Sequence, residues 1–138
     1  MPVVPVPVTC HSEKMEVQHV ARNTDLHLRN QMIYSVFVRN YSSEGTFEKV
    51  REDLPRIRSL GADIIWLMPI HPIGKSNRKG SMGSPYAIRD YRAINPEYGT
   101  LEDFQALVDS IHALGMKVII DVVYNHTSPD SWLRENHP

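Results

Sequence analysis

The side chains with the clearest chemical potential follow an apolar run near the end of the chain. Asp121 lies within the run 118–123, and Asn125 and His126 come four and five residues after it. A carboxylate in an apolar strand costs several kcal/mol unless it is paired or hydrogen-bonded. Asp, Asn and His at this spacing can form a metal site, a sugar-binding site or a buried polar network that holds a loop. The spacing alone leaves all three open.

A second set of polar side chains lies in the long stretch 70–99. Gly74 and Lys75 invite comparison with a phosphate-binding loop, but their order differs from Gly-x-x-x-x-Gly-Lys-Ser/Thr, so a solvated basic loop is favoured. Tyr86 could present an aromatic face to a ligand or pack the loop, and composition alone favours packing. Because so long a connection is rarely idle in a compact domain, we expect a functional loop.

Strands and helices at predictable places must position these side chains. Residues 33–38 are β-branched and aromatic, and 64–68 and 118–123 are largely apolar, as parallel strands covered on both faces require. Apolar residues at a three-to-four spacing predict helices over 47–60 and 101–114. This alternating order predicts an α/β fold with a parallel sheet and right-handed crossovers.

Local signals mark the ends of the predicted helices. Gly61 and Gly115 each follow a Leu and are expected to cap a helix in the same way. The segment from Thr100 to Asp103 resembles a capping box that would start the second helix. Pro55 lies inside the first helix and is expected to distort it or to mark a second start.

Parallel sheets bind ligands beyond the carboxyl ends of their strands, in open doubly wound folds and in barrels alike. Three segments are expected at this edge: 39–45, 69–99 and 124–138. The first βα connection lacks the glycine fingerprint of dinucleotide-binding folds, which disfavours a doubly wound cofactor enzyme. Periodicity alone does not choose between the two architectures.

The composition disfavours several classes of protein. Of 138 residues, 41% are hydrophobic and 22% charged, and the net charge is −1, so we expect a globular chain that binds neither nucleic acid nor a membrane. No apolar stretch is long enough to span a bilayer. One cysteine, Cys10, and the lack of a recognisable signal peptide favour a cytoplasmic location. A complete (β/α)8 barrel needs about 250 residues, more than this chain has.

Residues 1–31 differ from the rest and are expected to form an N-terminal extension that is extended or poorly ordered. Its first nine residues are rich in Pro and Val, and the remainder is polar with weak periodicity. His11, His19 and His27 recur every eight residues, a spacing typical of neither a helix face nor a metal site. A tail or a packing segment is therefore favoured.

Motifs from 32 to 132 resemble, in order, those of the α-amylase family, glycoside hydrolase family 13. The most specific is Asp121-Val122-Val123-Tyr124-Asn125-His126, which has the Asp-Val-Val-x-Asn-His form typical of that family. The earlier motifs lie at 33–47, 60–69, 83–91 and 95–100.

This resemblance implies that residues 32–138 form an incomplete (β/α)8 TIM barrel, the N-terminal portion with about the first three strands. The family cleaves or transfers α-glucosidic bonds with retention, which needs a nucleophilic carboxylate and an acid/base carboxyl about 5–5.5 Å apart. The resemblance places both on later strands. No catalytic residue is therefore expected within these residues, and the chain alone is expected to be inactive.

The resemblance also implies roles for side chains that are present. Tyr86 corresponds to the aromatic residue that stacks on the glucose ring at the cleavage site, and His126 to the histidine that hydrogen-bonds the primary hydroxyl of that glucose. Asp121 corresponds to a buried carboxylate that organises the site, and Asp90 to a structural acid in the loop. Asn125 corresponds to a position that ligates Ca²⁺ in many α-amylases and is structural in other members of the family, so calcium is the one candidate cofactor.

Gly83 bears on the choice of substrate. Exo-acting α-glucosidases of the family carry an Asp three residues before the stacking Tyr, where this chain has Gly83. The departure favours an endo-acting enzyme of starch or maltodextrin, with an α-glucan or maltooligosaccharide as partner. The alternative is a non-catalytic sugar-binding module or remnant, which would keep Tyr86 and His126 without the carboxylate pair.

Overall fold

The structure of the chain is a computed structural model, and it describes residues 25–137. Three parallel strands form a sheet in the order β1–β2–β3, which confirms the predicted α/β fold. The strands are β1 (Met32–Val36), β2 (Ala62–Leu67) and β3 (Lys117–Ile120). The helices are η1 (Leu26–Asn30), α1 (Val38–Tyr41), α2 (Phe47–Ser59), α3 (Leu101–Ala113) and α4 (Trp132–Asn136). Within the described range no helix is long and apolar enough to cross a membrane.

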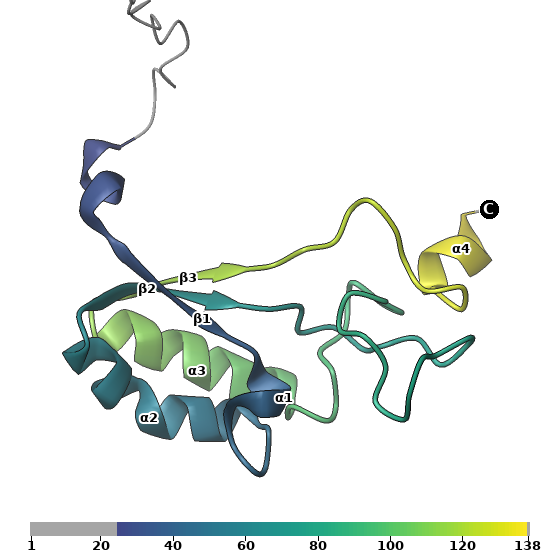
Figure 1. Cartoon of the computed structure of the whole chain (residues 1–138), viewed down its shortest axis with the longest axis horizontal. Coiled ribbons are helices and arrows are strands. Elements are labelled where there is room, and N and C mark those ends of the chain that lie inside the picture. The colour runs from purple at the N-terminus through teal and green to yellow at the C-terminus, as the bar shows by residue number, and fades with distance from the viewer. Residues whose placement is uncertain (1–24, 138) are drawn as a thin grey trace, which may run out of the picture.

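Helices α2 and α3 lie side by side against one face of the sheet (Figure 1). The strand register pairs Tyr34 with Ile65 and Val36 with Leu67, so alternate side chains of β1 and β2 point to this face together. The buried residues that join the strands to the two helices are Val36, Leu54, Ile57, Ile65, Leu67, Leu107 and Ile111.

The opposite face of the sheet is also apolar, but α2 and α3 do not reach it. The register places Ile33 beside Ile64 and Trp66 beside Ile119 on this face. Ile33 is 52% exposed, Trp66 36% and Ile119 44%. The strands therefore have two apolar faces, as their composition predicted, and helices cover one of them.

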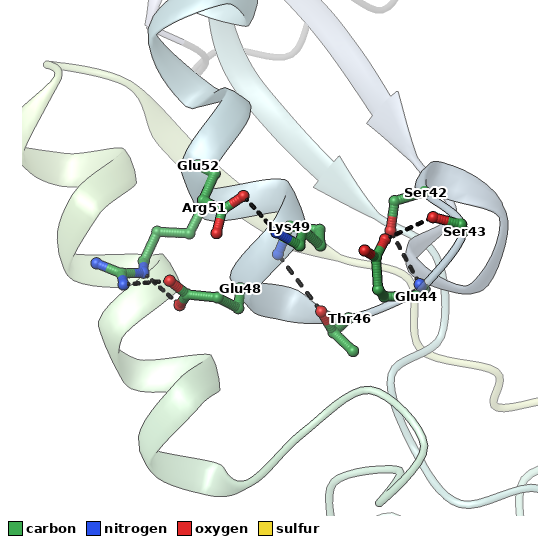
Figure 2. A network of polar contacts seen from close by, with 9 residues as sticks. Ser42, Ser43, Glu44, Thr46, Glu48, Lys49, Arg51 and Glu52 are labelled. Atoms are coloured by element: carbon green, nitrogen blue, oxygen red, sulfur yellow. Dashed lines mark hydrogen bonds and ion pairs between the residues drawn. The ribbon is translucent and has the colours of Figure 1, made fainter.

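A polar network fixes the start of α2 (Figure 2). The Thr46 hydroxyl oxygen accepts a hydrogen bond from the Lys49 backbone N–H at 3.4 Å, which satisfies one of the unpaired donors of the first turn. The Gly45 N–H donates to the Ser42 hydroxyl oxygen at 2.9 Å and closes the preceding turn. Two exposed ion pairs at 2.7 and 2.8 Å follow, and they add little stability in water: Glu48–Arg51 and Lys49–Glu52.

The predicted caps of α3 are confirmed. The Asp103 N–H donates to the Thr100 hydroxyl oxygen at 3.2 Å, and the Thr100 N–H donates to the Asp103 carboxylate at 2.8 Å, which is a complete capping box. Gly61 and Gly115 follow the two long helices with φ of +92° and +71°, the left-handed conformation that the repeated Leu-Gly junction predicted.

The bounds and course of several elements differ from the sequence prediction. Helix α2 runs unbroken through Pro55, so the expected second start is absent; Pro55 is exposed, and the carbonyl that loses its helical donor can bond to water. Strand β1 ends at Val36 rather than at position 38, because α1 follows almost directly. Strand β3 ends at Ile120 rather than at position 123, so Asp121 lies just beyond the strand.

The expected extension over residues 1–31 is described only from residue 25 onward. There Leu26–Asn30 forms the 3-10 helix η1, and the Asp25 carboxylate caps it by accepting a hydrogen bond from the His27 N–H at 2.9 Å. Three residues discussed from the sequence lie outside the described residues: Cys10, His11 and His19.

Candidate functional site

The loop after β2 and the segment after β3 meet beyond the carboxyl ends of the strands (Figure 1). The Ser128 N–H donates to the Ile88 carbonyl at 3.0 Å, and the Trp132 N–H donates to the Arg89 carbonyl at 2.9 Å. These bonds join two segments that are far apart in sequence. They build the edge at which parallel α/β folds bind their ligands.

Tyr86 and Asp121 come together at this edge. The Tyr86 hydroxyl donates to Asp121 Oδ2 at 3.0 Å, and the hydrogen bond raises the pKa of the Tyr86 phenol above its usual value. The Asp121 backbone N–H in turn donates to the Leu67 carbonyl at 2.8 Å. The Asp121 side chain is half-buried rather than buried, because it lies past the end of β3. Tyr86 stays 36% exposed, so its ring remains open to a ligand.

Asn125 and His126 lie on the exposed part of the segment after β3. Asn125 Nδ2 is 3.3 Å from His126 Nδ1, and both residues are exposed. Tyr91 holds this stretch from the loop side, since its hydroxyl lies 2.6 Å from the Val123 carbonyl and 3.1 Å from the His126 carbonyl. The backbone of His126 is thus anchored while its ring faces solvent.

Asp90 is paired with Arg92 in the loop after β2. Its carboxylate accepts hydrogen bonds from the Arg92 backbone and guanidinium at 3.0 and 3.1 Å, and these bonds lower the pKa of Asp90. The Arg92 guanidinium also stacks on the Trp132 ring, 3.4 Å from its centroid, which ties the loop to α4. The Asp90 carboxylate is therefore bonded to Arg92 rather than to Tyr86.

Two residues that hold the site received no role from the sequence. Tyr91 lies within the motif at 83–91, and its position there was the one available signal. Arg39 lies in α1, shortly after β1, and it donates to the Gly83 and Met82 carbonyls at 3.0 and 3.2 Å. A contact across 44 residues leaves no trace in local spacing.

An apolar pocket of about 520 Å³ lies beside the site. His71, Tyr91, Val123 and Tyr124 contribute to its wall, and neither Tyr86 nor His126 does. An apolar wall next to the edge of β3 suits packing of further protein better than a sugar, which needs several polar partners.

Asn125 is the candidate calcium ligand, and a calcium site there needs further oxygen donors around it. Calcium takes about six to eight oxygen ligands, usually including carboxylates. Within residues 25–137 no group of three or more His, Cys, Asp or Glu side chains could hold a metal ion. The described residues therefore do not by themselves fit a calcium site, and calcium at Asn125 stays a prediction.

Comparison with solved structures finds close relatives. The chain is 69% identical to an α-amylase from Lactobacillus plantarum, with a TM-score of 0.80 over 81% of this chain and 27% of that one. It is 45% identical to a maltogenic α-amylase from Thermotoga neapolitana, with a TM-score of 0.77 over 80% of this chain and 27% of that one.

Comparison with sequences agrees. The chain is 39% identical over 123 residues to an α-1,4-glucan:maltose-1-phosphate maltosyltransferase from Cereibacter sphaeroides, which is 76% of this chain and 20% of that enzyme. It thus spans about a fifth to a quarter of the relatives' length. The family model for the α-amylase catalytic domain matches residues 18–137, beginning inside the segment expected as an extension. The chain therefore belongs to the α-amylase family, glycoside hydrolase family 13, and its three parallel strands are part of the family's (β/α)8 catalytic barrel.

Proposed function

We propose that this chain is part of a retaining glycosidase that acts internally on the α-glucosidic bonds of starch- or maltodextrin-type glucans. The observation that carries the proposal is the 3.0 Å hydrogen bond from Tyr86 to Asp121, which joins two family motifs at the ligand-binding edge of the sheet. An aromatic ring held at one end by a carboxylate is a rigid platform for a sugar ring.

Tyr86 and His126 have complementary roles in this proposal. The ring of Tyr86 stacks on a glucose unit, and Asp121 fixes its orientation through the phenol hydroxyl. His126 donates to a hydroxyl of the same glucose, and Tyr91 fixes the backbone from which the imidazole projects. Asp90 keeps the loop in shape through Arg92.

Gly83 supports endo action on structural grounds. It has a φ of +69°, and a Cβ at this position would come within 3.0 Å of the Arg78 and Ile73 side chains. An Asp here, as in the exo-acting α-glucosidases, would be strained in this loop. The loop is therefore built for glycine, and it places no carboxylate at the position that holds the non-reducing end of a glucan.

The catalytic carboxylates are proposed to lie on later strands of the barrel, as the family resemblance implies. We therefore expect no starch hydrolysis by the 138 residues alone. In a protein extended through those strands, His126→Ala should lower kcat/KM, because it removes a hydrogen bond that strengthens in the transition state. The fall should correspond to a loss of about 1–3 kcal/mol of transition-state stabilisation.

Steady-state kinetics on maltoheptaose test this, with His137→Ala as the matched control, since His137 lies at the far end of α4. A loss confined to His126→Ala supports the proposal. Unchanged kinetics would remove the sugar-contact role, and starch hydrolysis by the 138 residues alone would contradict the placement of the carboxylates.

A second candidate is a non-catalytic glucan-binding module. It is favoured by the fact that Tyr86 and its anchor Asp121 lie within this chain and that Tyr86 is exposed. Calorimetry of the chain with maltoheptaose separates the two. Saturable binding that Tyr86→Ala abolishes would support the module, whereas no binding would support a site completed by the rest of the barrel.

A further inference from the structure

We infer that Arg39 is the positioning residue for Tyr86. Its guanidinium holds the turn at Met82–Gly83 through two backbone carbonyls, and Tyr86 follows this turn three positions later; we call this contact the clamp. The consequence for sugar contact rests on the proposed function, but the clamp itself does not. Arg39 belongs to the segment after β1, Tyr86 to the loop after β2 and Asp121 to the segment after β3. The inference therefore connects all three strand ends through one arginine.

The contacts of Arg39 are those of a clamp. Its two terminal nitrogens donate to the carbonyls of Gly83 and Met82 at 3.0 and 3.2 Å, and its side chain is only 13% exposed. One of these nitrogens also lies 3.9 Å from the Glu97 carboxylate. A guanidinium presents several donors in a fixed plane, so it can grip two consecutive carbonyls at once.

The base of the clamp is rigid. The Arg39 guanidinium lies over the Phe37 ring, 5.5 Å from its centroid, in a cation–π contact. Gly45 closes over the Arg39 backbone with a φ of +66°, and a Cβ there would come within 2.7 Å of the Arg39 carbonyl oxygen. Any larger residue at position 45 would push the turn away. The arginine therefore projects from a fixed point.

The turn can transmit that position to Tyr86. The Tyr86 N–H donates to the Ser84 hydroxyl oxygen at 3.2 Å, and the Ala87 N–H donates to the Ser84 carbonyl at 3.0 Å. The Gly74 N–H donates to the Ala87 carbonyl at 2.9 Å, which ties the far side of the turn to the start of the same loop. Only Ser84 and Pro85 separate the clamped Gly83 from Tyr86, and the two hydrogen bonds to Ser84 hold this short stretch.

A merely structural role for Arg39 has a different signature. The Arg39 Nε, the Tyr98 hydroxyl and the Asn95 side-chain nitrogen are buried without hydrogen-bond partners among the described residues. Burial also raises the pKa of Tyr98. If Arg39 served only to fill this buried polar space, its loss would disturb Tyr98 and leave the Tyr86–Asp121 bond intact.

The test uses the full chain with ¹³C-labelled tyrosine, titrated with alkali and followed by NMR, with Tyr86 assigned through Tyr86→Phe. Asp121→Asn removes the carboxylate that raises the pKa of Tyr86, so the titration midpoint of Tyr86 in this variant marks complete loss of the Tyr86–Asp121 contact. We expect Arg39→Met to move the Tyr86 midpoint most of the way to that value. Arg39→Lys, with a single nitrogen for two carbonyls, should move it less, and the surface control Arg51→Met should not move it.

The titration midpoints of Tyr86 and Tyr98 distinguish the clamp from simple space filling. A Tyr86 midpoint unchanged in Arg39→Met, with Tyr98 altered, would overturn the inference in favour of simple space filling. If Arg39→Met loses all native tyrosine signals, Arg39→Lys decides alone: a lowered Tyr86 midpoint supports the clamp, and a wild-type midpoint rejects it. Calorimetry with maltoheptaose on an extended protein reports on the proposed function separately, since failed glucan binding beside a normal midpoint shift would leave the clamp standing.

Discussion

The two faces of the sheet are built from similar residues but meet different surroundings. On the helix-covered face Ile65 and Leu67 are fully buried against α2 and α3. On the opposite face Ile33 of β1 and Ile119 of β3 are 52% and 44% exposed, although they belong to the same sheet. The contrast shows that the two faces share their apolar character and differ in whether helices cover them.

The barrel explains the contrast. In a (β/α)8 barrel, helices cover the outside of the sheet, and side chains from all strands fill the interior. The face with Ile33, Trp66 and Ile119 is the interior face, so its apolar residues match partners on other strands. Among the described residues, helices cover only the outer face, and the two faces should respond differently to substitution.

The largest effect should come from a matched pair of isoleucines. Ile65→Ala should destabilise the chain by about 2–5 kcal/mol because it opens a cavity under α2 and α3. Ile33→Ala should change stability by less than about 1 kcal/mol, since Ile33 is 52% exposed. Urea unfolding followed by circular dichroism measures both. Equal losses would mean that the exposed face is covered in solution.

The cap of α3 should matter next, because α3 covers the outer face. Thr100→Ala removes the hydroxyl oxygen that accepts the 3.2 Å hydrogen bond from the Asp103 N–H and should cost about 1 kcal/mol, whereas the Thr100 backbone N–H that donates to Asp103 stays. Thr46→Ala removes one longer bond of 3.4 Å at the start of α2 and should cost less. The same urea experiment compares them, and a larger loss for Thr46→Ala would contradict the ranking.

Alkaline pH should destabilise the helix-covered side of the sheet through ionisation of Tyr41, which packs against the core. Burial and the hydrogen bond to Asp53 raise the pKa of Tyr41 from 10.0 to about 12. A raised pKa stabilises the fold below pH 10 and loses that stabilisation as the pH rises towards 12. The melting temperature should therefore fall between pH 10 and pH 12. Tyr86→Phe removes the contribution of the Tyr86 phenol to this fall, and Tyr41→Phe in that background should reduce the fall that remains. A fall unchanged in Tyr41→Phe would exclude Tyr41 as the cause.

The smallest effect on stability is expected at the exposed face. Ile119→Thr should change the free energy of unfolding by no more than about 0.5 kcal/mol. It should nevertheless reduce binding of a hydrophobic dye, because it removes exposed apolar surface. Val118→Thr, one residue away and packed against the core, is the control and should cost more stability. Equal dye binding before and after Ile119→Thr would argue against an open face.

Most of the fold could be predicted from local sequence. The capping box at Thr100, the glycines after α2 and α3 and the apolar runs each act within one or two turns, so local patterns report them. The errors lie at element ends. Strand β3 ends at Ile120, although the Asp121 N–H still bonds to the Leu67 carbonyl, and α2 continues through Pro55, which is exposed.

The site was predictable only in part. Family motifs pointed to Tyr86, Asp90, Asp121, Asn125 and His126, and the structure brings Tyr86 and Asp121 into contact. The motifs did not indicate that Asp90 pairs with Arg92. Nor did they indicate the supports from Tyr91 and Arg39, which reach carbonyl oxygens that every residue possesses.

The order of strands and helices, their caps and the apolar character of both sheet faces follow from the amino-acid sequence. These features depend on residue type and short-range spacing, which hold in any context. Tertiary structure alone decided which apolar face is covered and which polar groups meet. Tyr86 reaches Asp121 across 35 residues and Arg39 reaches Gly83 across 44, so both contacts depend on the path of the intervening backbone.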